Sequence, residues 1–167
     1  YYRNIIGSMN EKPILVGHSL GGVIVQKLMA LKLGAAAVCI NSGPPKGIAA
    51  LNYNFIVSNM LLSSPFSAKD GLVLMDKHWY HRYVTNEMSL KATEKFIAKF
   101  CVPASRKIIS TISRIDFSIN KNPILFISGQ LDKSQPPIIN YKNFKAYPKE
   151  IKKDYKVFEG RTHNIID

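Results

Sequence analysis

The stretch that decides the fold is PILVGHSLGGVIVQ, residues 13–26. It begins with a short apolar run that ends at Gly17, which is typical of a buried strand. A broad apolar face at helical spacing follows over residues 21–33 and predicts a helix packed on a sheet. Between the two lies GHSLGG, residues 17–22, which is a G-x-S-x-G motif at a strand-to-helix junction. This context predicts a sharp turn that presents the hydroxyl of Ser19 at the carboxyl end of the strand.

The residue types of the motif suit such a turn. A serine on a strained turn needs small neighbours, so we expect Gly17 and Gly21 to remove Cβ atoms that would collide, and Gly22 to let the helix approach the strand. The backbone N–H of Leu20, at the helix N-terminus, would then face the place where an oxyanion develops. A phosphate-binding loop would need a lysine after the glycines, and Val23 stands there.

Two further apolar runs, residues 35–40 and 122–128, are predicted to be strands, and residues 154–158 form a weaker fourth strand pattern. They are separated by helical stretches and lack strict alternation, which indicates a parallel α/β sheet flanked by helices.

The stretch between the second and third strands is too long for a loop and shows no convincing strand pattern. It is rich in aromatic residues and methionine, and Ser89 is placed to cap a helix that begins at Leu90. We therefore predict an α/β core over residues 1–43 and 121–167, with a helical cap insertion over 44–120.

A serine nucleophile needs a base, and the base needs an acid that orients it. In this kind of sheet the order along the chain is serine, acid, histidine. Asp132 follows the third strand and His163 follows the fourth, so both fall at the edge where such sheets carry function. The alternatives are a turn or N-cap role for Asp132 and a surface position for His163. Asn41, after the second strand, occupies another acid position but has no carboxylate.

Three other histidines have separate interpretations. His18 flanks the nucleophile and is expected to shape the pocket or to pack behind the turn. His78 and His81 could face one way on a helix, but no third ligand is evident, so no metal site is predicted.

The composition is that of a globular protein, with 46% hydrophobic and 20% charged residues in 167. Cys39 and Cys101 lie far apart and match no metal spacing, so reduced thiols are expected rather than a disulfide framework. The net charge is +12, from 23 basic and 11 acidic residues. Most of the cations are scattered lysines, which favours a solvated surface over a nucleic-acid site, because nucleic-acid readers rely on arginine and interleaved aromatics.

Three segments, residues 17–22, 129–132 and 159–163, together resemble the nucleophile, acid and histidine segments of the α/β-hydrolase superfamily. The resemblance is to esterase/lipase-like members with a helical cap, and phrases of the cap are similar to a bacterial branch. It implies that Ser19 is the nucleophile, Asp132 the acid and His163 the base.

The same resemblance implies that the N–H of Leu20 is one oxyanion donor and that no cofactor is needed. It also implies a cap that forms an apolar lid or acyl pocket, although such aromatic-rich stretches are more often ordinary core. The residues expected there are Phe66, Met75, Trp79 and Tyr80.

The chain also departs from the family pattern. Members have further strands before the nucleophile strand, with a loop that supplies a second oxyanion donor, and a final helix after the histidine. Only about twelve residues precede the first strand here, and the sequence ends at Asp167. We therefore expect the C-terminal part of the fold, with the first strand as an exposed edge. Loss of one oxyanion donor costs about 2.7–4 kcal/mol of transition-state stabilisation.

These features lead to two hypotheses of different class. The first is a serine hydrolase acting on a small ester or lipid-like substrate, although related motifs also serve thioesterases, amidases and C–C hydrolases. The second is an inactive remnant that binds partners or oligomerises through its exposed sheet edge. The net charge also leaves open docking to anionic lipid surfaces. Few cysteines and no evident leader favour the cytoplasm.

Overall fold

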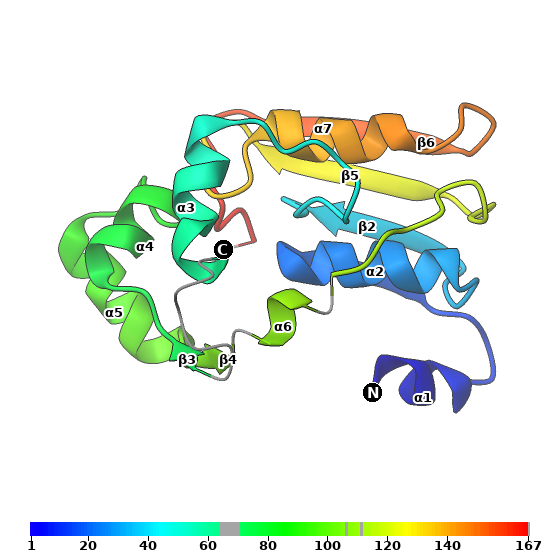
Figure 1. Ribbon diagram of the computed structural model, residues 1–167, viewed down its shortest axis with the longest axis horizontal. Helices are drawn as coiled ribbons and strands as arrows, with labels where there is room; N and C mark the ends of the chain where they lie inside the picture. Colours follow the sequence, from blue (N-terminus) through cyan, green and yellow to red (C-terminus); the bar gives the residue numbers. More distant parts are fainter. Residues whose placement is uncertain (64–70, 106, 111, 167) are drawn as a thin grey trace.

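The computed structural model describes residues 1–63, 71–105, 107–110 and 112–166, and its centre is a four-stranded parallel sheet (Figure 1). The strands follow one another across the sheet in the order β1-β2-β5-β6. All three neighbouring pairs are parallel, as predicted, and each strand begins and ends within two residues of its predicted bounds. The bounds are β1 (Ile14–His18), β2 (Ala36–Ile40), β5 (Ile124–Gly129) and β6 (Lys153–Phe158).

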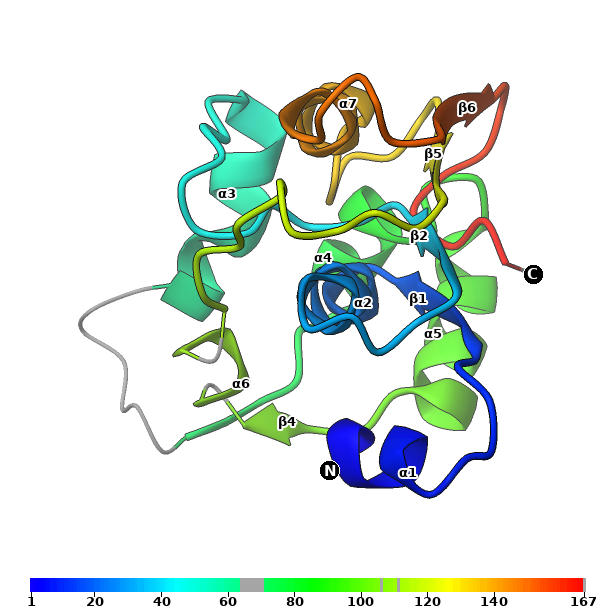
Figure 2. The same cartoon turned by 90° about the vertical axis from the view of Figure 1, so that its right-hand side faces the viewer.

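Two helices pack on one face of this sheet. Helix α2 (Leu20–Ala30) joins β1 to β2 and packs on both strands, and α7 (Pro137–Ala146) does the same for β5 and β6 (Figure 2). Between the helices and the sheet lies the core, in which Phe126 and Cys39 are fully buried. Burial of these apolar side chains is the main contribution to the stability of the layer.

The other face of β1 is open. Ile14 and Val16 are 67% and 63% exposed, whereas Leu15, which points the opposite way, packs against the core. The prediction of a fully buried strand is therefore wrong for β1, because the helices that pack on the described sheet lie on its other side. The expectation that this strand forms an edge is met, since β1 stands at one end of the strand order.

Helix α2 ends earlier than the apolar pattern predicts. It stops at Ala30, and Lys32 adopts a left-handed backbone with φ 59°. The N–H of Leu33 then donates to the carbonyl of Leu28, and that of Lys32 to Met29, which closes the helix in a Schellman motif. The apolar side chains after residue 30 belong to this cap and not to a further helical turn.

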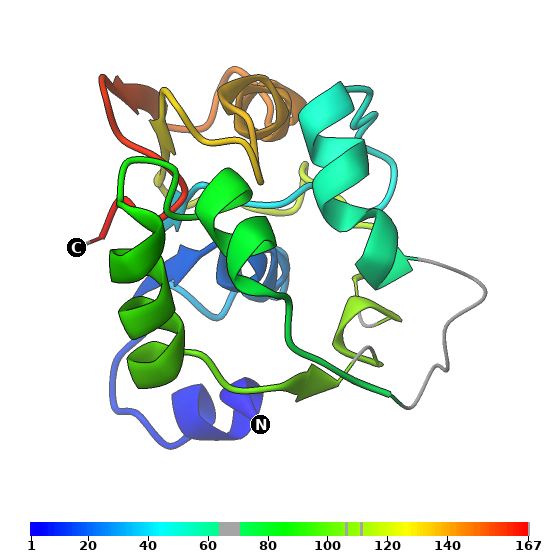
Figure 3. The same cartoon turned by 90° about the vertical axis from the view of Figure 1, so that its left-hand side faces the viewer.

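In its described residues, the stretch between β2 and β5 contains four helices, which gather beyond the carboxyl ends of the strands (Figures 1 and 3). Ser89 caps one of these helices by accepting a hydrogen bond from the N–H of Ala92 at 3.2 Å. The sequence did not predict the short antiparallel pair β3 (Leu72–Val73) and β4 (Ala104–Ser105), because two residues are too few to show a strand pattern. The helices are α3 (Tyr53–Ser63), α4 (Lys77–Tyr83), α5 (Leu90–Phe100) and α6 (Lys107–Ser110).

The remaining element is α1 (Tyr2–Gly7), which precedes β1. Both cysteines are free thiols, as predicted. Within the described ranges, no helix combines the length and apolar character needed to cross a bilayer.

Candidate active site

Ser19 stands on the turn between β1 and α2 in a backbone conformation that non-glycine residues rarely adopt. Its φ is 55° and its ψ is −119°. Three hydrogen bonds hold it there. The N–H of Ser19 donates to the carbonyl of Ile40 at 2.9 Å, and its carbonyl accepts from the N–H groups of Gly22 and Gly43 at 3.1 and 3.2 Å. The end of the neighbouring strand thus fixes the strained turn.

The glycines of the motif differ in what they do. A Cβ on Gly17 would lie 2.3 Å from the carbonyl oxygen of Gly21, and one on Gly22 would lie 2.6 Å from the side chain of Ser42. The predicted need for a small residue is confirmed at these two positions. The prediction for Gly21 is wrong, because a Cβ there would meet nothing within 4 Å. The crowded group at Gly21 is its carbonyl, not its side-chain position.

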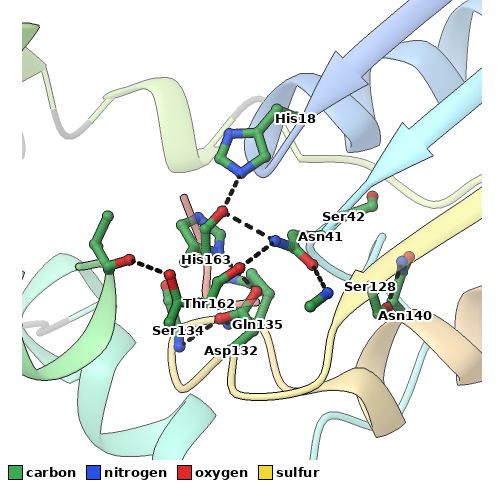
Figure 4. Close-up of polar contacts among 12 residues, drawn as sticks. His18, Asn41, Ser42, Ser128, Asp132, Ser134, Gln135, Asn140, Thr162 and His163 are labelled. Atoms are coloured by element: carbon green, nitrogen blue, oxygen red, sulfur yellow. Dashed lines mark hydrogen bonds and ion pairs between the residues drawn. The ribbon is translucent and has the colours of Figure 1, made fainter. Parts of the chain in front are cut away.

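Asp132 and His163 form a buried pair, although they come from different loops (Figure 4). Oδ2 of Asp132 lies 2.8 Å from Nδ1 of His163, and the residues are 3% and 5% exposed. The other carboxylate oxygen, Oδ1, accepts from the backbone N–H groups of Ser134 and Gln135 at 2.8 and 2.7 Å. Asp132 follows β5 and His163 follows β6, so the parallel strands deliver both to one edge of the sheet.

The carbonyl of His163 is held from the ends of two other strands (Figure 4). His18 at the end of β1 contacts it through Nε2 at 2.7 Å, and Asn41 after β2 donates to it from Nδ2 at 2.9 Å. The same Nδ2 of Asn41 donates to the carbonyl of Thr162 at 3.1 Å, while Oδ1 of Asn41 accepts from the N–H of Gly129 at 2.8 Å. Asn41 therefore links three segments of the sheet edge.

Burial, with a smaller contribution from the neighbouring ring of His163, lowers the pKa of His18 to about 4. The two ring centroids are 4.7 Å apart. His18 is therefore neutral at ordinary pH and has one N–H to donate. Since a carbonyl can only accept, that hydrogen is on Nε2.

A cavity of about 500 Å³ opens at Ser19, which is a volume within the range of small-molecule sites. Ser19, Leu20, His18 and His163 line it, and so do Trp79 and Tyr80 from α4.

The other two residues predicted to line the pocket, Met75 and Phe66, do not appear in its described lining. Met75, which was predicted to belong to the pocket, is not among the residues that line this cavity. Phe66 lies outside the described residues. Sequence reasoning missed further lining residues, which are scattered over several elements: Phe55, Asn59, Val84, Phe96, Cys101 and Gln135.

The strand order, the turn at Ser19 and the cavity above the carboxyl edge together define the α/β-hydrolase fold, and comparison with solved structures confirms this prediction. A monoacylglycerol lipase from Paleococcus ferrophilus superposes with a TM-score of 0.67 at 20% sequence identity, over 99% of this chain and 65% of that one. A methylesterase from Arabidopsis superposes with a TM-score of 0.67 at 17% identity, over 96% of this chain and 66% of that one. Polyneuridine aldehyde esterase gives 0.63 at 16% identity, over 98% and 70%.

No protein-family model and no curated protein sequence matches the chain. The chain spans about two thirds of the length of the solved structures named first, 65% and 66%. At these identities the likeness establishes the fold alone.

Proposed function

We propose that this chain carries the active site of a serine hydrolase that cleaves a carboxylic ester. The observation that supports it best is the pair of Asp132 and His163, joined at 2.8 Å beside the cavity onto which the strained turn of Ser19 opens. A non-glycine residue with a positive φ, such as Ser19, is uncommon, and backbone strain of this kind is concentrated at functional sites. The lipase and esterases of the same fold support an ester as the substrate.

The proposed reaction uses each residue in one role. Oγ of Ser19 attacks the ester carbonyl carbon as Nε2 of His163 takes its proton. Asp132 keeps the hydrogen of the ring on Nδ1 and stabilises the imidazolium that forms. The C–O bond to the alcohol then breaks, and His163 returns the proton to the leaving oxygen. Water repeats the sequence on the acyl-serine and releases the carboxylic acid.

Leu20 is the proposed source of one oxyanion donor. It is the first residue of α2, so its N–H has no acceptor within the helix. A donor at this place favours the negative charge that develops on the carbonyl oxygen. We take the helices of residues 44–120 as a cap over this site, since they supply much of the cavity wall.

The cavity favours an uncharged substrate. Its described lining is largely apolar and contains no lysine, arginine, aspartate or glutamate, despite the high net charge of the chain. A second cavity of about 480 Å³ shares four apolar residues with it, Leu20, Val23, Ile108 and Ile112, whereas Arg3 and Lys27 line the second cavity alone. Burial of a charged acyl group in the first cavity without a partner would be costly. We therefore propose neutral esters with an apolar acyl group.

A fluorophosphonate probe tests the nucleophile. Wild-type protein should be labelled, Ser19→Ala should not, and Ser105→Ala should behave as wild type. Ser105 is a matched control because it lines the same cavity but lies on β4, away from the strained turn. Absence of labelling in a folded wild-type sample contradicts the proposal, as does labelling that survives Ser19→Ala.

A pair of model esters tests the substrate class. The p-nitrophenyl ester of a short alkanoic acid should be hydrolysed at least tenfold faster, in kcat/KM, than an ester of equal length that ends in a carboxylate. Equal rates would show that the apolar lining does not select the acyl group.

The second candidate function is self-association through the edge of β1. Ile14 and Val16 are exposed on this edge strand, and such edges pair readily with a second copy of the same strand. Val16→Lys should then convert a dimer to a monomer in sedimentation experiments. A wild-type chain that stays monomeric at tens of micromolar would argue against this candidate.

A further inference from the structure

We infer that Asn41 and His18 are positioning residues for the catalytic histidine, and that they act by fixing its backbone carbonyl. This inference rests on the proposed hydrolase function. The oxygen of His163 accepts from Nε2 of His18 at 2.7 Å and from Nδ2 of Asn41 at 2.9 Å. Neither residue needs to touch the reacting ester to do this.

The two donors complete an anchorage that Asp132 alone does not provide. Asp132 holds one atom of the ring, Nδ1, and a ring held at one atom can still swing with the loop that carries it. The carbonyl of His163 is the second fixed point, and both of its donors come from the ends of sheet strands. With ring and carbonyl both fixed, Nε2 keeps one direction relative to Ser19.

Asn41 is chemically matched to this task. Both hydrogens of its amide are used, on the carbonyls of Thr162 and His163, and its oxygen accepts from the N–H of Gly129. The side chain is fully buried, and its φ of 42° lies in the left-handed region that asparagine tolerates. Only a group with a donor end and an acceptor end satisfies all three neighbours.

Aspartate is therefore the most informative replacement. Asn41→Asp keeps the size, the tolerance of left-handed backbone and the acceptor for Gly129. It replaces two N–H donors by an oxygen that faces the carbonyls of Thr162 and His163. The change therefore removes the contact to the histidine loop, and adds repulsion, at little cost in volume.

At His18 two replacements separate the donor from the ring. His18→Leu removes the hydrogen bond to the carbonyl of His163. His18→Gln keeps an N–H at nearly the same reach, because Nε2 of glutamine lies about as far from Cα as Nε2 of histidine. Recovery of activity by glutamine would identify the hydrogen bond, and not the aromatic ring, as the feature that matters.

The experiment measures kcat and KM with a neutral p-nitrophenyl ester, together with the rate constant and end point of fluorophosphonate labelling. Asn41→Asp and His18→Leu should lower kcat by about 10- to 100-fold with KM within about twofold, because a displaced catalytic group costs about that much. The labelling rate constant should fall in parallel while the labelled fraction at completion stays high. His18→Gln should recover most of the kcat that His18→Leu loses.

Asn140→Asp is the matched control for the asparagine. Asn140 is also fully buried, and its Nδ2 donates to Ile127 and Ser128, away from the histidine loop. It should lower the free energy of unfolding without the fall in labelling rate constant.

Two outcomes would overturn the inference. One is a kcat within about threefold of wild type in both Asn41→Asp and His18→Leu. Another is a loss that appears only as a smaller labelled fraction with an unchanged rate constant, which would mean that the residues support folding alone. If Asn41→Asp does not fold, the comparison of His18→Leu with His18→Gln still tests the inference. A wild-type protein that is never labelled overturns the proposed function itself, and is recognised because the unmutated chain is then inert.

Discussion

Asp132→Asn tests how the site controls the hydrogen of His163. Oδ1 of Asp132 accepts two backbone hydrogen bonds, from Ser134 and Gln135, whereas Oδ2 contacts Nδ1 of His163. In the asparagine variant the amide oxygen must stay on the side of the two N–H groups, because an NH₂ there would face two other donors. The amide nitrogen is then forced toward Nδ1.

A ring that accepts at Nδ1 must carry its hydrogen on Nε2. His163 would then have no lone pair to take the proton of Ser19, and the base would be lost without a change in shape. By comparison with the equivalent change in other serine hydrolases, kcat should fall about 10⁴-fold, which corresponds to about 5 kcal/mol in the barrier. KM should change little, since Asp132 does not line the cavity.

The assay is hydrolysis of a neutral p-nitrophenyl ester near pH 7.5, with fluorophosphonate labelling as a second readout. Asp116→Asn is the matched control, because Asp116 also accepts from a backbone N–H two residues on, at Ser118, but is exposed. A folded Asp132→Asn protein with kcat within tenfold of wild type would refute the reasoning. A loss of equal size in Asp116→Asn would attribute the effect to folding.

Three further outcomes follow from the same geometry. The pKa of His18 is about 4 when folded and about 6.5 when unfolded, so the unfolded chain binds more protons between these values. Urea titrations should show the free energy of unfolding fall by up to about 3 kcal/mol from pH 6.5 to pH 4, and His18→Gln should flatten that slope. Gly17→Ala should lower the free energy of unfolding by about 3 kcal/mol, because the added methyl group would overlap the backbone of Gly21. Gly21→Ala should raise the free energy of unfolding by up to about 1 kcal/mol, and equal effects of the two changes would contradict the contacts described. In steady-state kinetics, Trp79→Ala should raise KM about tenfold with kcat little changed, whereas Met75→Ala, at a residue that does not line the cavity, should leave KM unchanged.

The sequence predicted most of the fold because the local signals and the tertiary structure agree. Three of the four strands are short apolar runs in the sequence, and the motif at residues 17–22 stands at the predicted strand-to-helix turn. The carboxylate–histidine pair was also predictable, since Asp132 and His163 each follow a strand and parallel strands end at one edge.

The sequence failed where a contact depends on atoms from distant segments. Asn41 was considered as a position for an acid, and nothing local indicates that its amide reaches the loop of His163, 122 residues away. Gly21 matched the motif, but whether a Cβ collides depends on packing that a pattern does not record. The sequence also does not show which residues line the cavity, so Met75 was predicted wrongly and Cys101 was missed.

The span of the contact between His18 and His163 has a consequence for how the protein loses activity. These residues are 145 positions apart, so their hydrogen bond closes one of the longest loops in the chain. The core around Phe126, by contrast, lies between the sheet and the helices that pack on it. Contacts at the rim of a fold open at lower free energy than its core does. On warming, the hydrogen bond between His18 and His163 should therefore break, and activity should be lost, before the sheet unfolds.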